Sequence, residues 1–280
     1  MPEIKLIALD LDGTLLDSDK VISKPNLEAL NDAASRGVWI VPATGRLATA
    51  LPSAVDELPY VRYVIASNGA AIVDRKTGQT LSRAEIGWKR ALDIMEVLDG
   101  LPVIYDCYAA GGAFMTAENK LKIPEFAPDR HYLEMWQKLR QPVPDLKNWI
   151  RERGQDVQKV QCLFKDMELR LVWLKKFPEM FPDLTVTSSV VNNIEFSHSD
   201  ANKGAALLTL ASLLNIPREQ TMAFGDDLND LPMIRKAGIG VAMKNASDTV
   251  RLAADYVTDS CDESGVATAV RKFMHPCFEE

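Results

Sequence analysis

The sequence has few cysteines, no paired cysteine motif and no long hydrophobic run. Its four cysteines stand far apart in 280 residues and none forms a CxxC pair, which argues against a zinc site or a disulfide framework. The most apolar helical stretch, residues 205–216, contains polar side chains and is too short to cross a bilayer. The first residues do not combine a basic segment with a long apolar one, so no secretory signal is expected. We therefore expect a cytoplasmic protein without a membrane partner.

Basic charge is also scarce. The 32 lysines and arginines are outnumbered by 39 acidic residues, which gives a formal net charge of −7. Nucleic-acid binding usually needs a basic face, so no nucleic-acid partner is expected. A small anionic ligand is still compatible with this balance, because a metal ion and a few cations can set the local field. The length suits one large domain or two smaller ones.

Short apolar runs alternate with amphipathic helical stretches at the beginning of the chain. Residues 4–9, 38–41 and 63–66 have the composition of buried strands, and residues 25–36 have helical spacing that ends at Gly37. This alternation predicts a parallel sheet covered by helices on both faces.

The pattern changes after Ser82 and returns near residue 191. The intervening segment is richer in tryptophan and proline and indicates a separate α+β module. We predict an α/β protein whose core, residues 1–82 and 191–280, is a Rossmann-like, doubly wound parallel sheet. Residues 83–190 would form the inserted module.

A pair of aspartates follows the first predicted strand, in Asp10-Leu11-Asp12-Gly13-Thr14. Side chains at i and i+2 of an extended segment point to the same side, so both carboxylates can face one cavity, about 6.6 Å apart along the chain. Magnesium between them would relieve their repulsion. One carboxylate can act as a nucleophile and the other as a general acid and base. Alone, the motif is as typical of an acidic turn.

Two further clusters carry a hydroxyl and a cation. Thr44-Gly45-Arg46 follows the second strand, where a hydroxyl and bare backbone N–H groups can bind phosphate oxygens. Arg46 could contact the substrate or pair with a surface acid. Lys203 lies in the first turn of an apolar helix, where it opposes the helix dipole. This placement makes sense if an anion lies opposite, although a solvated lysine is the commoner case.

The last cluster is acidic and follows a third strand, in Gly225-Asp226-Asp227-Leu228-Asn229-Asp230. An acidic group here can complete a metal shell, although the segment is equally typical of a capped helix start. Asn68 precedes a glycine in Ser67-Asn68-Gly69-Ala70, the usual pair of a hairpin turn. Because each cluster follows a strand or begins a helix, a parallel sheet would gather all of them at one edge.

These clusters, in this order, resemble the haloacid dehalogenase superfamily of phosphatases. The inserted module and the Ser67–Ala70 segment are similar to its Cof-type group with a C2-type (IIB) cap, and the resemblance covers essentially the whole chain. It implies that Asp10 is the nucleophile, that Asp12 is the general acid and base, and that the module is a cap that selects the substrate. The cofactor would be Mg²⁺, held by the Asp10 side chain, the Asp12 backbone carbonyl and Asp226. The expected phosphate or substrate contacts are Leu11, Thr44, Gly45, Arg46, Lys203 and Asn229, and the expected supporting residues are Asn68, Asp227 and Asp230.

Several cap residues could face the substrate, although each is more typical of a structural or surface role: Asp106, Tyr108, Arg130, His131 and Trp136. The sequence does not choose among them.

We therefore predict a magnesium-dependent phosphatase that hydrolyses a small phosphorylated metabolite through an aspartyl-phosphate, as a monomer or homodimer. Two alternatives remain open: a phosphotransferase or phosphomutase on the same scaffold, and a non-catalytic protein that binds a phosphometabolite. The prediction would be wrong if Lys203 or Asp226 lay more than about 10 Å from Asp10, beyond any contact or water bridge.

Overall fold

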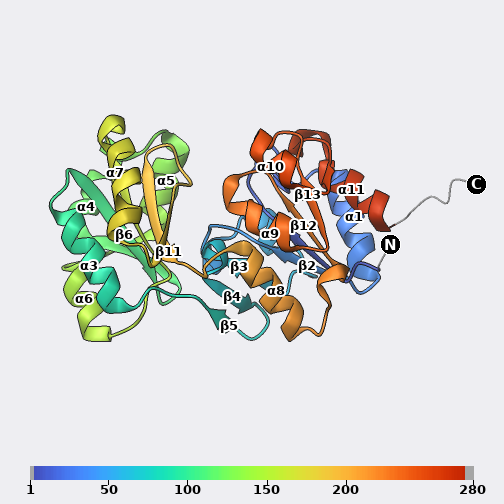
Figure 1. The fold of residues 1–280 in the computed structure, drawn as a ribbon, viewed down its shortest axis with the longest axis horizontal. Coiled ribbons are helices and arrows are strands. Elements are labelled where there is room, and N and C mark those ends of the chain that lie inside the picture. Colours follow the sequence, from blue (N-terminus) through green and yellow to red (C-terminus); the bar gives the residue numbers. More distant parts are fainter. Residues whose placement is uncertain (1–2, 275–280) are drawn as a thin grey trace, which may run out of the picture. The chain divides into compact units, whose positions relative to one another are not determined.

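The computed structural model describes residues 3–274, and within them it divides into two compact units (Figure 1). Unit 1 combines the residues up to Ser82 with those from Asn202 onward, and unit 2 is the continuous segment Arg83–Ala201. None of the described helices is both long and apolar enough to span a membrane.

Unit 1 is built on a parallel sheet with strand order β14-β13-β12-β1-β2 in the described part of the chain. The strands are β1 Leu6–Leu9, β2 Trp39–Pro42, β12 Thr221–Gly225, β13 Ile239–Ala242 and β14 Tyr256–Val257. The first strand of the chain therefore pairs with a strand more than two hundred residues later, with Leu9 opposite Phe224. Asp10 and Asp226 follow these two neighbouring strand ends.

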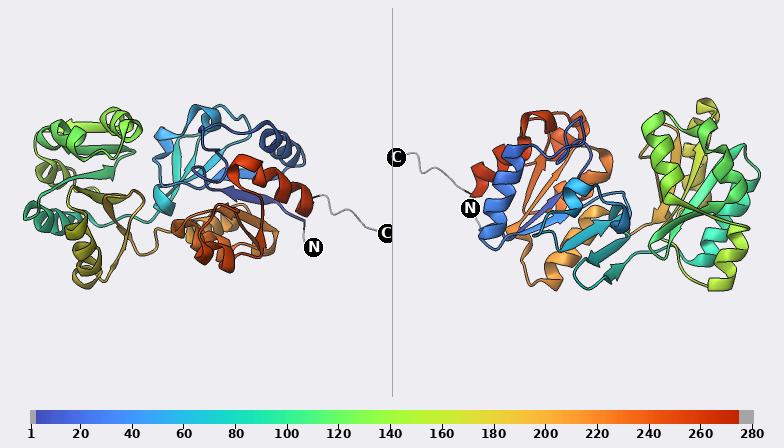
Figure 2. Two further views of the ribbon diagram at one scale, coloured as in Figure 1. Left: turned by 90° about the horizontal axis from the view of Figure 1, so that it is seen from above. Right: turned by 180° about the vertical axis from the view of Figure 1, so that it is seen from behind.

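Helices cover both faces of this sheet, because alternate residues of each central strand need burial on opposite sides. Ile7 and Leu9 share a hydrophobic cluster with α1 (Lys24–Ser35) and α11 (Gly265–Met274), whereas Leu6 and Ala8 share one with α8 (Lys203–Leu213). Figure 2 shows α1 (blue) and α11 (red) side by side. The helices of unit 1 are α1 Lys24–Ser35, α2 Ser53–Asp56, α8 Lys203–Leu213, α9 Leu231–Lys236, α10 Asp248–Ala253 and α11 Gly265–Met274, with short 3₁₀ turns η1 Ala48–Ala50, η2 Ser67–Gly69, η3 Arg218–Gln220, η4 Leu228–Asp230 and η5 Cys261–Glu263.

Local signals set the ends of α1. The Ser23 side chain accepts a hydrogen bond from the Asn26 backbone, and a proline occupies the first turn. Gly37, with φ +82°, follows the helix as the sequence predicts. A second, antiparallel sheet consists of β3 Tyr63–Ala66, β4 Ala71–Asp74 and β5 Gln79–Arg83. The expected hairpin at Ser67–Ala70 joins β3 to β4.

Unit 2 is a mixed sheet with strand order β10-β11-β9-β6-β7-β8. Its strands are β6 Val103–Ala109, β7 Gly112–Thr116, β8 Arg140–Val143, β9 Lys159–Phe164, β10 Leu184–Thr187 and β11 Asn193–His198. One face packs against α3 Trp88–Asp99, α6 Leu146–Arg153 and α7 Met167–Met180. The other packs against α4 Ala117–Phe126 and α5 Arg130–Leu139.

The expected second boundary, between residues 190 and 191, is too early. Strand β11 pairs with β9 and β10 of the inserted module, so unit 2 continues to Ala201. Residues 194–196 were expected to be a strand of the core, but their composition does not identify the partner strand.

Candidate active site

The chain brings Asp10, Asp226 and Asp230 together at the carboxyl ends of β1 and β12. Selected carboxylate oxygens of these three side chains all lie within 4.8 Å of one another. The Asp10 backbone N–H donates to the carbonyl of Phe224 at 3.1 Å, which fixes the end of β1 against β12. The expected contact between the first and last acidic clusters is therefore present.

Lys203 supplies the cation of this cluster. Its Nζ lies 2.5 Å from Asp10 Oδ1 and 2.6 Å from Asp230 Oδ1, and its side chain is fully buried. Burial lowers the pKa of Lys203, but the two carboxylates outweigh burial and raise its pKa above the ordinary lysine value. The Asn202 side chain caps helix α8 by accepting from the Ala205 backbone at 2.8 Å, so the lysine projects from a fixed first turn.

Asp230 connects this lysine to the loop after β12. Its Oδ2 accepts hydrogen bonds from the backbone N–H groups of Asp226 and Asp227, at 3.0 and 3.1 Å. Its Oδ1 contacts Lys203, so both carboxylate oxygens are engaged within the protein. Asp227 itself caps the short η4 turn, where its Oδ1 accepts from the Leu228 backbone.

Asp226 is held by the loop that follows β1. Thr14 Oγ1 donates to Asp226 Oδ1 at 2.7 Å. Gly13 adopts φ +87°, and a Cβ at this position would lie 2.4 Å from Asp226 Oδ2. Only glycine therefore lets the two loops approach this closely. The Gly13 carbonyl also accepts a hydrogen bond from Asn245 Nδ2 at 2.8 Å.

The acidic cluster carries more negative charge than its lysine neutralises. Burial, with the neighbouring Asp230 and Asp226 charges, raises the pKa of Asp10 to about 8 in spite of Lys203. Burial likewise raises the pKa of Asp226 to about 6. Among the described residues, no hydrogen bond reaches Asp10 Oδ2 or Asp226 Oδ2. Two carboxylate oxygens without a hydrogen bond, one on the buried Asp10 and one on the half-buried Asp226, fit a hard divalent cation such as Mg²⁺.

Asp12 lies at the more open side of the site, where two cations hold it. Arg46 donates from Nε to Oδ2 and from Nη2 to Oδ1, each at 3.0 Å, and Lys20 Nζ lies 3.0 Å from Oδ1. Burial opposes ionisation of Asp12, but the bonds from Arg46 and Lys20 outweigh it and lower the pKa. Arg46 was expected to contact the substrate, but in this structure it pairs with Asp12, the predicted general acid and base.

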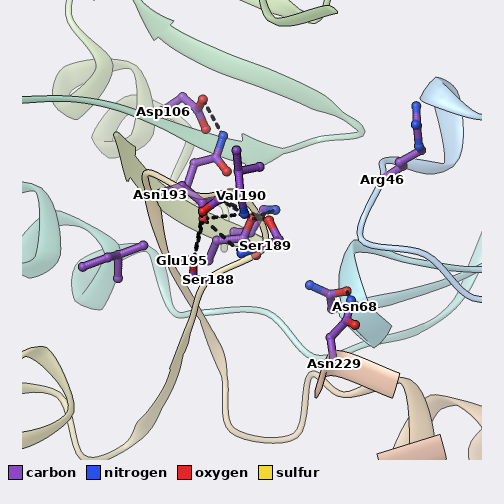
Figure 3. A network of polar contacts seen from close by, with 12 residues as sticks. Arg46, Asn68, Asp106, Ser188, Ser189, Val190, Asn193, Glu195 and Asn229 are labelled. Atoms are coloured by element: carbon purple, nitrogen blue, oxygen red, sulfur yellow. Dashed lines mark hydrogen bonds and ion pairs between the residues drawn. The ribbon is translucent and has the colours of Figure 1, made fainter. Parts of the chain in front are cut away.

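The remaining phosphate-binding candidates lie on neighbouring loops of unit 1. Thr44 is buried, and its hydroxyl accepts from the Arg46 backbone at 3.2 Å. Asn229 Nδ2 donates to Asn68 Oδ1 at 3.1 Å, and Figure 3 shows these two side chains turned toward each other. Leu11 has a fully buried side chain, and its carbonyl accepts from the backbone of Thr14.

Sequence reasoning missed three contacts that organise the site. They are Thr14 to Asp226, Lys20 to Asp12, and Asn245 to the Gly13 carbonyl. Thr14 belongs to the first motif, and Asn245 lies shortly after the end of β13. Lys20 has no sequence signal, because its side chain reaches back across a turn.

The cap candidates have structural partners in unit 2. Asp106 forms an ion pair with Arg140 at 2.7 Å, and both side chains are buried. Tyr108 and Trp136 are also buried, whereas Arg130 is exposed and pairs with Glu134. The side chain of His131 lies outside the described structure.

Unit 2 also contains a buried polar network around Asn193 (Figure 3). Its Oδ1 accepts from the backbone of Ser189 and Val190, each at 3.0 Å, and its Nδ2 donates to Glu195 Oε1 at 3.0 Å. The same Glu195 oxygen pairs with Lys159 at 2.7 Å. Figure 3 shows Ser188, Ser189, Val190 and Glu195 gathered around Asn193.

Comparison with known proteins agrees with the family resemblance. A family model for haloacid dehalogenase-like hydrolases matches residues 7–270. The chain is 33% identical to Phosphatase YwpJ of Bacillus subtilis, over 97% of this chain and 100% of that protein. It is 31% identical to the B. subtilis 5-amino-6-(5-phospho-D-ribitylamino)uracil phosphatase YcsE, over 97% and 96% of the two chains.

Solved structures agree with the fold. A haloacid dehalogenase-like hydrolase from B. subtilis aligns with a TM-score of 0.80 at 32% identity, covering 98% of this chain and 100% of that one. A subclass IIB sugar phosphatase of the superfamily shares the fold, with a TM-score of 0.79 at 23% identity and coverage of 96% and 98%.

The parallel sheet and the acidic strand ends thus define a haloacid dehalogenase-like hydrolase. The chain belongs to that superfamily, among its Cof-type phosphatases.

Proposed function

We propose that this phosphatase hydrolyses a small phosphorylated metabolite with Mg²⁺, through a phosphoryl group carried on Asp10. The observation that supports this most strongly is the position of Asp10 beside Lys203 and Asp226, with one carboxylate oxygen unengaged. Magnesium would be held by Asp10, Asp226 and, by resemblance, the Asp12 carbonyl. When bound, it would neutralise charge on the cluster and on the phosphate.

In the first step, an Asp10 oxygen attacks phosphorus and forms an acyl-phosphate while the substrate P–O bond breaks. Lys203 orients Asp10 through its other oxygen and contributes positive charge beside the phosphate. Asp12 donates a proton to the leaving oxygen. Asp12 must be protonated for this step, and the negative phosphate nearby favours its protonation by opposing the carboxylate charge.

In the second step, Asp12 accepts a proton from water, and this water attacks phosphorus. The acyl-phosphate bond breaks, which releases inorganic phosphate and restores Asp10. Arg46 and Lys20 suit this step because they favour the ionised form of Asp12. Thr44, Gly45 and Asn229 are the further candidates for binding the phosphate oxygens. We also predict that unit 2 selects the substrate and that the protein is cytoplasmic.

The test is phosphate release by the purified protein from a panel of sugar, nucleotide and cofactor phosphates, with Mg²⁺ or EDTA. Because three relatives are named for it, the panel includes 5-amino-6-(5-phospho-D-ribitylamino)uracil. We expect turnover of at least one ester only with the metal. Asp10→Asn should abolish it, and mass spectrometry of acid-quenched wild-type protein should find phosphate on the Asp10 peptide.

Residual turnover of Asp10→Asn within about tenfold of wild type would contradict the role of Asp10. Transfer of the phosphoryl group to a second hydroxyl without release of free phosphate would instead favour the phosphotransferase alternative. Binding without turnover of any ester would favour a metabolite-binding protein.

A further inference from the structure

The turn Ser67–Gly69 has an unusual backbone for its residues. Ser67 and Asn68 both adopt left-handed conformations, with φ 49° and 56°, and Gly69 follows with φ 97°. Left-handed non-glycine residues are uncommon, although asparagine tolerates the region better than most. Consecutive residues of this kind persist only where the surrounding structure fixes them. The contacts of the turn identify what that surrounding structure is.

One set of contacts joins the turn to the loop after β2. The Ser67 backbone N–H donates to the Arg46 carbonyl at 2.9 Å, and the Asn68 N–H donates to the Thr44 carbonyl at 3.0 Å. A Cβ on Gly45 would lie 3.1 Å from Asn68 Oδ1. The Asn68 side chain therefore lies directly on the glycine between the two bonded carbonyls.

A second contact joins the turn to the start of helix α8. A Cβ on Gly69 would lie 2.4 Å from the Asn202 carbonyl oxygen and 3.0 Å from the Lys203 backbone nitrogen. The backbone of the turn thus packs directly against the backbone of Asn202 and Lys203, where helix α8 begins.

The third contact joins the turn to the loop after β12. Asn68 Oδ1 accepts from Asn229 Nδ2 at 3.1 Å, while Asn229 Oδ1 is buried without a hydrogen-bond partner. A carbonyl oxygen can only accept, so Asn68 selects the orientation in which Asn229 presents its NH₂ group. The second hydrogen of that group stays free to donate.

We propose that Asn68 is a positioning residue for the phosphate site: its side-chain carbonyl orients the Asn229 amide, and its turn holds the Thr44–Arg46 loop and the start of α8 in register. This inference rests on the proposed function, since Thr44, Gly45, Lys203 and Asn229 are the phosphate-binding candidates. Asn68 supports them without needing to touch the phosphate itself.

The test compares Asn68→Gly with Asn215→Gly. Glycine accepts the left-handed backbone at both positions, and Asn215, with φ 56°, lies on the exposed turn after α8. Only the first substitution removes the acceptor for Asn229. Calorimetry with inorganic phosphate in the presence of Mg²⁺ measures affinity without requiring turnover. We expect Asn68→Gly to weaken phosphate binding about tenfold, or about 1.4 kcal/mol, and Asn215→Gly to leave it unchanged.

A double-mutant cycle with Asn229→Ala separates positioning from general destabilisation. If Asn68 acts through Asn229, Asn68→Gly should cost much less in the Asn229→Ala background. Fully additive losses, or an unchanged affinity in Asn68→Gly, would overturn the inference. Should Asn68→Gly prove unstable by thermal melting, Asn68→Asp replaces it, since aspartate also tolerates this backbone. Aspartate keeps an oxygen that accepts from Asn229 Nδ2, so in this variant the coupling to Asn229→Ala decides: a change that is fully additive with Asn229→Ala would again overturn the inference.

A failure of this inference can be distinguished from a failure of the proposed function. Wild-type protein that binds phosphate but hydrolyses no ester would contradict the proposed function and leave the role of Asn68 to be decided by the same cycle.

Discussion

Lys203 and Asp10 are 193 residues apart in the chain, yet the lysine Nζ lies 2.5 Å from the aspartate Oδ1. On its other side the same nitrogen contacts Asp230 at 2.6 Å. A single buried cation thus connects the end of β1, the start of α8 and the loop after β12. This relationship makes the lysine as important for the fold of unit 1 as for its chemistry.

Replacing Lys203 by methionine should destabilise the protein strongly. The change leaves Asp10 and Asp230 buried without their cation, and removing one partner of a buried pair costs about 3–5 kcal/mol. Urea unfolding at neutral pH without metal measures the loss. The matched control is Lys244→Met, because Lys244 is exposed and pairs with Glu263. Exposed pairs are worth about 1 kcal/mol or less, so equal losses in the two variants would contradict the burial argument.

Gly13→Ala should impair the metal site, whereas Gly37→Ala should only strain the backbone. Both glycines have positive φ, of +87° and +82°. A Cβ on Gly13 would lie 2.4 Å from Asp226 Oδ2, but a Cβ on Gly37 would meet nothing within 4 Å. We expect about 1–2 kcal/mol of backbone strain in each variant, and loss of Mg²⁺-dependent turnover of at least about tenfold only at Gly13. Equal turnover in both would show that the Asp226 contact is unimportant.

Stabilisation by Mg²⁺ should grow with pH. Burial raises the pKa of Asp226 from 3.8 to about 6, and that of Asp10 to about 8. The folded, metal-free protein therefore binds more protons than the unfolded chain, and it loses stability as pH rises from about 4 to about 8. Magnesium needs ionised carboxylates, so protons compete less with it at high pH.

Thermal melts with MgCl₂ or EDTA test this at about pH 5 and about pH 8. We expect the larger magnesium-induced rise in Tm at the higher pH and little rise in Asp226→Asn. A rise of equal size at both values would show that these carboxyls do not bind the metal.

Asp12→Asn should separate the two halves of the reaction. Loss of a general acid and base costs about 10²–10⁴-fold. With p-nitrophenyl phosphate, whose leaving group needs no proton, the first step should survive better than with an alcohol ester. The phosphoryl group should then accumulate on Asp10, since no base activates water, and mass spectrometry can detect it. Asp19→Asn, on an exposed turn, is the control; a loss as large there would contradict a specific role for Asp12.

The sequence predicted the centre of the core sheet well because its central strands are fully buried. The strands β1, β12 and β13 are buried along their whole length, and α8 begins at Lys203, the residue expected in its first turn. Residues 63–66, expected as a strand of the parallel sheet, instead form β3 of the antiparallel sheet. In unit 2 the helix α3 was missed, although Ala91, Ile94, Met95 and Leu98 carry its buried stripe. Helix α7 contains Pro178 and still continues to Met180. A proline near the end of a helix removes a single bond, which the burial of Phe177 and Phe181 offsets.

The site was predictable in its location but not in its pairings. Parallel strands end at one edge, so motifs that follow strands must gather there. Which oxygen meets which cation depends on side-chain directions that no spacing encodes. The pairing of Arg46 with Asp12 is the clearest example, because Arg46 alone is equally consistent with a phosphate contact.

The pairing of Leu9 with Phe224 has a consequence for synthesis on the ribosome. Unit 2 is one continuous segment and has all its strands once residue 201 has emerged, whereas β1 must wait for β12 before its central neighbour exists. Domains tend to fold as units during translation. The active site of a nascent chain therefore cannot assemble until β12 has been synthesised. Termination before β12 would yield a protein with a folded unit 2 and no active site.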